Sequence, residues 1–140
     1  MKKYFTYFVC ISIAVAGCRK ESEPIFNQSP DERLNEALQR YQQVLTGAPH
    51  GWNATLETAI GITFGFYFRF NDSNRVVMYS DFDSVTASVS RESSYRLKAL
   101  QQPSLLFDTY SYIHLLADPD ARVNGGFYGS GLGSDFEFSI

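Results

Sequence analysis

The chain has 140 residues, of which 44% are hydrophobic and 16% aromatic, and its formal net charge is −3 at pH 7. This length suits one domain at most. Because no cluster of Lys and Arg follows Lys20, a basic surface for nucleic acid is excluded, and we expect no nucleic-acid partner.

Residues 1–17 have the pattern of a bacterial lipoprotein signal peptide. Two lysines precede an apolar stretch from Tyr4 to Ala16, and small residues then stand directly before Cys18. The stretch is shorter than the roughly 20 residues that a membrane-spanning helix needs, so we favour a signal peptide over a membrane anchor. We predict cleavage before Cys18 and lipidation of Cys18, with a plain secretory peptide as the alternative.

The mature chain would then be held at a membrane by its lipid. It would have no free thiol and no disulfide, because Cys10 is removed with the signal peptide. Residues 18–29 are polar and resemble the acidic tethers that follow the lipidated cysteine in surface-displayed lipoproteins. We therefore expect an outer-membrane lipoprotein of the cell envelope, displayed at the surface.

The clearest helix is predicted over residues 30–45. Ser29 suits the N-cap and Pro30 the first helical position, while Gly47 and Pro49 end the helix. One apolar stripe has helical spacing: Leu34, Ala37, Leu38, Tyr41, Val44 and Leu45. We expect this stripe to pack against the sheet that follows.

Three alternating segments then predict strands, over residues 51–57, 61–70 and 75–80, with the last two joined by a turn at 71–74. Gly65 would permit a bend or a bulge. One face of the second strand carries four aromatic rings: Phe64, Phe66, Phe68 and Phe70. We expect these rings to form core, with an exposed ligand platform as the alternative.

The rest of the chain predicts a meander of short strands. A short strand is expected at 84–89 within a polar loop, followed by strands at 94–101 and 104–107. Residues 108–119 fit a strand or a short helix capped by Asp108, and we favour the helix. Residues 123–133, rich in glycine, predict a loop.

Residues 134–140 alternate again, and the chain stops within this strand pattern. Either the strand pairs back onto the sheet, or the chain is a fragment of a longer product. The predicted fold class is α+β, mainly antiparallel β. Residues 30–140 are expected to form an N-terminal helix followed by a lipocalin-like or partial β-barrel sheet. If the chain is the N-terminal part of a longer domain, this sheet is incomplete. The alternative is an open α+β sheet covered by the helix.

No residues with recognisable catalytic spacing are found, so we predict no enzyme, no metal and no cofactor. The two histidines are too few for a typical zinc or iron site, and His114 stands in an apolar context that favours a buried, hydrogen-bonded ring. The segment around Ser130 departs from the nucleophile-elbow pattern. Asp108, Asp118 and Asp120 lack the later ligands of a calcium loop, and we interpret them as turn residues.

Several segments together resemble an uncharacterised lipoprotein family of Bacteroides-group bacteria, domain of unknown function four-three-zero-two. They are PDERL at 30–34, GW at 51–52, FYFRF at 66–70, RVVMYSD at 75–81, SYRL at 94–97, PSLLFDTY at 103–110 and SDFEF at 134–138. The resemblance covers nearly all of the mature chain, and family members are longer, so the chain corresponds to their N-terminal part. No catalytic residue is carried across.

The resemblance implies a role beside nutrient-uptake lipoproteins or transporters of the cell surface. The expected function is therefore a non-catalytic binding or accessory component of nutrient uptake, with an unknown ligand. The alternative is a hydrolase whose active site is completed by C-terminal sequence outside this chain.

Overall fold

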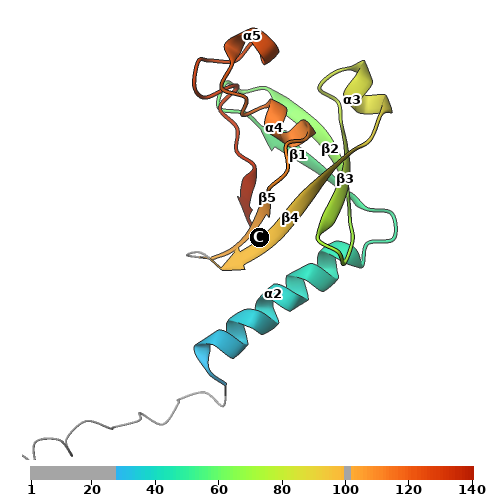
Figure 1. The fold of residues 1–140 in the computed structure, drawn as a ribbon, viewed down its shortest axis with the longest axis vertical. Coiled ribbons are helices and arrows are strands. Elements are labelled where there is room, and N and C mark those ends of the chain that lie inside the picture. The colour runs from blue at the N-terminus through green and yellow to red at the C-terminus, as the bar shows by residue number, and fades with distance from the viewer. Residues whose placement is uncertain (1–27, 100–101) are drawn as a thin grey trace, which may run out of the picture. The chain divides into compact units, whose positions relative to one another are not determined.

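Six antiparallel strands form a curled half-barrel sheet in the order β1-β2-β3-β4-β5-β6 (Figure 1). The computed structural model describes residues 28–99 and 102–140. The strands are β1 Trp52–Glu57, β2 Thr63–Phe70, β3 Arg75–Ser80, β4 Arg91–Ala99, β5 Pro103–Phe107 and β6 Glu137–Ser139. The predicted fold class, mainly antiparallel β with an incomplete barrel, is confirmed.

The sheet curls because β4 changes its pairing partner halfway along its length. Its first part, up to Ser94, pairs with β3, and its second part, from Tyr95, pairs with β5. Ser93 is fully buried at this corner, where its hydroxyl donates to Thr109 O (2.5 Å). The strand also begins at Arg91, three residues earlier than predicted.

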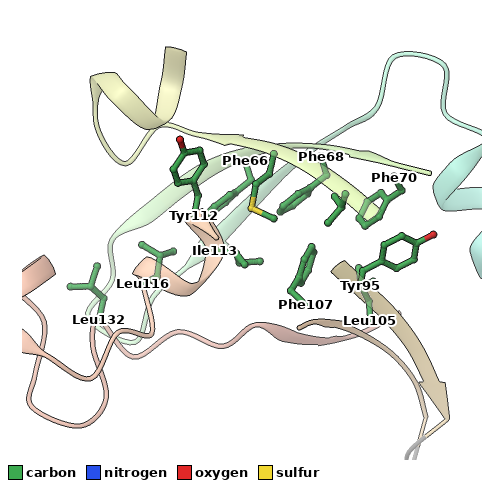
Figure 2. Packing of buried hydrophobic residues seen from close by; sticks show 12 residues of the cluster. Phe66, Phe68, Phe70, Tyr95, Leu105, Phe107, Tyr112, Ile113, Leu116 and Leu132 are labelled. Carbon is green, nitrogen blue, oxygen red and sulfur yellow. The ribbon is translucent and has the colours of Figure 1, made fainter. Parts of the chain in front are cut away.

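The core lies inside this curl. A flat sheet would place β2 and β5, three strand spacings apart, at about 14 Å, yet the ring centroids of Phe68 and Phe107 are 5.3 Å apart. Figure 2 shows rings from the two walls facing one another. The buried hydrophobic residues are Phe66, Phe68, Phe70, Val76, Met78, Tyr95, Leu105, Phe107, Tyr112, Ile113, Leu116 and Leu132.

The hairpin of β2 and β3 has the predicted turn. Asn71 Oδ1 accepts from the N–H groups of Ser73 and Arg75, and Asn74 adopts a left-handed φ of 57°. Gly65 forms no bulge, since the pairing of β1 with β2 runs through it without interruption. A Cβ at this position would lie 2.9 Å from Asp81 Oδ2, whose carboxylate accepts a hydrogen bond from Gly65 N–H, so a larger residue would have to displace the Asp81 side chain.

Helix α2, Pro30–Thr46, confirms the predicted N-terminal helix. Its apolar stripe is covered only in part: Ala37, Leu38, Tyr41 and Leu45 are half-buried, whereas no described residue of α2 is fully buried and Val44 is 53% exposed. Leu45, near its end, packs against the core.

Two local predictions in the second half of the chain are also wrong. Residues 84–89 form the helix α3, Ser84–Ser88, rather than a strand, because Asp83 and Thr86 cap its first turn reciprocally (2.7 and 2.9 Å). The helix favoured within 108–119 is present as α4, Tyr112–Leu115, but Ser111 is its N-cap. Asp108 pairs with Arg96 instead.

The glycine-rich segment is a loop for most of its length, as predicted. It begins with a helical turn, α5 Ala121–Asn124, which ends at Gly125 in the left-handed region (φ 75°). A bridge between Phe127 and Gly131 closes the loop. Among the described residues, no helix has the length and apolar character required to cross a membrane.

Candidate functional site

An apolar cavity of about 220 Å³ opens on the inner face of the half-barrel. Its walls come from both ends of the sheet and from two helices. The lining residues are Leu45, Trp52, Asn53, Ala54, Thr55, Leu56, Phe66, Phe68, Leu105, Phe107, Ile113 and Phe138. None of these side chains is ionisable, so the cavity offers apolar contact rather than acid–base chemistry.

The cavity exists because β1 and β6 are the two ends of the sheet and do not pair with each other. Trp52 and Leu56 of β1 lie at one side and Phe138 of β6 at the other. A closed barrel would fill this space with the side chains of further strands. In the described part of the chain, the inner face of β1 stays open, and Trp52 is 37% exposed.

Trp52 also connects the cavity to the end of α2. Its indole Nε1–H donates to Leu45 O at 3.0 Å, and Leu45 itself contributes to the lining. An indole ring needs a partner for its N–H when it is partly buried. This hydrogen bond fixes the ring at the rim of the cavity.

A second cluster surrounds His114, which is 9% exposed. Its Nδ1 accepts from Ser111 N–H, and its Nε2 contacts Phe107 O, both at 3.1 Å. The ring lies between Tyr110 and Phe136, at centroid distances of 5.6 and 4.7 Å. Burial lowers the pKa of His114, so the neutral form is favoured. The prediction of a buried, hydrogen-bonded histidine is confirmed.

The three aspartates considered for calcium have different partners. Asp108 pairs with Arg96 (2.5 Å) and Asp120 with Arg122 (2.8 Å). Asp118 accepts from the hydroxyl of Tyr110 at 2.7 Å, and burial together with this carboxylate raises the pKa of Tyr110 to about 12. Within residues 28–99 and 102–140, no group of three His, Cys, Asp or Glu side chains is placed to hold a metal ion.

Three further residues considered in the sequence analysis are His50, Ser130 and Cys18, and neither His50 nor Ser130 is among the described residues that line the cavity. His50 is exposed in a turn after α2, and Ser130 lies in the loop bridged by Phe127 and Gly131. Cys18, the predicted lipidation site, lies outside the described residues. The sequence thus identified His114 correctly as a buried, hydrogen-bonded residue. It did not locate the cavity, although Phe66 and Phe68, from the face considered as a ligand platform, line it.

Comparison with known proteins gives a family. Residues 22–140 match the family described as Domain of unknown function (DUF4302). The chain belongs to the DUF4302 family. No curated protein and no solved structure matches it significantly. The match confirms the domain family inferred from the sequence, and the family description assigns no activity to this DUF4302 domain.

One wall of the cavity in this DUF4302 domain is the face of β1 that carries Trp52, Ala54 and Leu56. The alternation of apolar and polar residues predicted that this face is half-buried. Trp52, Ala54 and Leu56 have the pattern of a half-buried strand, and the strand is present. The sequence signal nearest to a site was the aromatic face of β2, of which Phe66 and Phe68 line the cavity. Whether a strand face is covered depends on its neighbours in space, which the pattern does not contain.

Proposed function

We propose that this DUF4302 chain is a lipid-anchored protein of the cell envelope whose half-barrel binds an apolar ligand group without catalysing a reaction. The observation that carries the proposal is the preformed cavity of about 220 Å³ with no ionisable side chain in its lining. Pockets for small ligands are mostly apolar and largely preformed. Burial of apolar surface there contributes roughly 25 cal/mol per Å².

The proposed location follows from the N-terminus. Cleavage before Cys18 and acylation of that cysteine would anchor the protein in the outer membrane, with residues 19–29 as a tether. The proposed role is a binding or accessory component beside nutrient-uptake lipoproteins or transporters. The support for this role is the signal-peptide pattern together with the family resemblance.

Binding in the cavity can be measured through Trp52, because the chain contains one tryptophan and it lines the cavity. The mature protein is titrated with the apolar dye N-phenylnaphthylamine, and energy transfer from Trp52 to the dye is recorded. We expect Ala54→Leu to fill the cavity and to weaken binding about tenfold, which is about 1.4 kcal/mol.

The control is Ala87→Leu, the same change at an exposed position of α3 outside the cavity lining. It should leave dye binding unchanged. Equal affinity of the wild type and Ala54→Leu, or equal loss in both variants, would contradict binding in this cavity.

The anchor is tested separately. Cys18→Ala should remove acyl labelling and release the protein from the membrane fraction, whereas Cys10→Ala, within the predicted signal peptide, should change neither. Membrane association of Cys18→Ala equal to that of the wild type would contradict lipidation at this residue.

A further inference from the structure

We propose that the cavity receives an extended peptide segment, which adds to the free edge of β1 and places alternate apolar side chains in the cavity. This inference rests on the proposed function and names its class of ligand. Strand addition combines main-chain hydrogen bonds along a sheet edge with pockets for every second side chain. The half-barrel has both features at one place.

The pairing register shows which backbone groups of β1 are free. Thr58 N–H donates to Ile62 O, and these residues continue the register in which Ala54 faces Phe66. In an antiparallel pair, bonded and non-bonded positions alternate. The N–H and C=O groups of Asn53, Thr55 and Glu57 therefore point away from β2, toward the edge that no described strand occupies.

The same free edge borders the cavity. Asn53 and Thr55, whose backbone groups point outward along the sheet, are among the residues that line it. Ala54 and Leu56 alternate with these residues along β1, so their side chains lie on the inner face of the sheet. A strand paired with β1 would direct the side chains opposite Ala54 and Leu56 into the cavity.

The size of the cavity favours side chains over a whole small molecule. Its volume of about 220 Å³ is below the roughly 300–1,000 Å³ of pockets that enclose a drug-sized ligand. A few apolar side chains suit it better, and the rest of the peptide would lie along the edge. The expected ligand thus alternates apolar and polar residues.

Charge at the edge indicates which polar residues the peptide carries. Glu57 is exposed, forms no ion pair within the described residues, and has no Lys or Arg beside it in β1. Residues that face each other across an antiparallel pair share one side of the sheet, and opposite charges there are favourable. We therefore expect Lys or Arg opposite Glu57.

The edge of β6 is the less suitable of the two free edges. It contains three residues, and the N–H of Glu137, one of its outward groups, is within 3.2 Å of Asp135 Oδ1. The β1 edge has six residues and no such cap on Asn53, Thr55 or Glu57, and the free edge ends at Ala59, whose N–H donates to Gly133 O at 2.9 Å. The proposal therefore commits to β1.

The test uses the mature protein and a synthetic peptide of alternating Val and polar residues, with Lys at two polar positions. Binding is followed through Trp52 and through displacement of N-phenylnaphthylamine. Two matched peptides carry N-methyl groups, one at the polar residues and the other at the Val residues. Methylation at the polar residues should reduce affinity at least tenfold, because their N–H groups would bond to β1. Methylation at Val should have a much smaller effect.

Two protein variants locate the edge. Glu57→Gln should weaken binding of the Lys-containing peptide and leave dye binding unchanged, while Glu137→Gln should affect neither. Equal effects of the two methylated peptides, or a loss confined to Glu137→Gln, would overturn strand addition to β1. A self-association of the protein that excludes the peptide, measured by sedimentation, would overturn it in favour of a second copy as the occupant.

The outcomes separate this inference from the proposed function. If the dye binds in the cavity and the peptides do not, the peptide inference fails and the apolar binding site stands. If neither the dye nor the peptides bind, the proposed function itself fails.

Discussion

His114 joins three segments of the chain through one buried ring. Its two nitrogens contact Ser111 N–H and Phe107 O, and its faces contact Tyr110 and Phe136. The arrangement uses the neutral imidazole, since Nδ1 must accept a hydrogen bond from a backbone N–H. Protonation would place two donors against each other, so this ring is expected to make stability depend on pH.

Burial lowers the pKa of His114 below its ordinary value of about 6.5. The unfolded chain then binds a proton at a higher pH than the folded chain. The contribution of His114 to the free energy of unfolding is complete above about pH 6.5 and is lost as the pH falls through the folded pKa. Urea unfolding between pH 7.5 and 5 should show this decrease.

His114→Gln should flatten this decrease, and His50→Gln provides the control because His50 is exposed. The His50 variant should keep the pH dependence of the wild type. A wild-type free energy of unfolding that rises as the pH is lowered through this range would contradict the role given to His114.

Gly65 is a second residue whose identity depends on a close approach. A Cβ at this position would meet Asp81 Oδ2 at 2.9 Å, and the carboxylate would lose its hydrogen bond from Gly65 N–H (2.7 Å). We expect Gly65→Ala to lower the free energy of unfolding by about 1–3 kcal/mol. In a double-mutant cycle with Asp81→Ala, the two losses should not add, because they remove one interaction. Additive losses would contradict this pairing.

At the level of elements, α3 depends on Thr86 more than on helix propensity. The buried hydroxyl of Thr86 accepts from Asp83 N–H (2.9 Å) and donates to Ser80 O (3.0 Å). Thr86→Val keeps the shape and leaves these backbone groups without a partner, which should cost about 1–3 kcal/mol in thermal or chemical unfolding. Ser84→Ala, at an exposed position of the same helix, should have little effect. A similar loss in both variants would show that the cap is not the cause.

Across the whole molecule, stability depends on the rings packed between the two walls of the half-barrel. Phe70 is 7% exposed and contacts Tyr95 edge-on at a centroid distance of 5.0 Å. Phe70→Ala should destabilise the protein by about 3–5 kcal/mol and lower its melting temperature sharply. Phe127→Ala, at a ring that is 64% exposed, should leave the melting temperature nearly unchanged. A small effect of Phe70→Ala would argue against a core inside the curl.

Most of the elements of this fold follow from local patterns. The helix from Pro30, the hairpin of β2 and β3, and the strands β5 and β6 lie where spacing and turn residues predict them. The strand expected at 84–89 fails because the side chains of Asp83 and Thr86 supply a helix cap. Reciprocal side-chain bonds of this kind outweigh a weak alternation in so short a segment.

The sequence by itself determined the helix from Pro30, the hairpin of β2 and β3 and the aromatic face of β2, because each depends on residues close together in the chain. Only the tertiary structure decided where the predicted partial barrel curls, how much of α2 is covered, and that β1 and β6 leave a cavity between them. The curl lies where β4 changes its pairing partner, between Ser94 and Tyr95. Pairing between distant strands is set by packing over the whole sheet, which no local pattern contains.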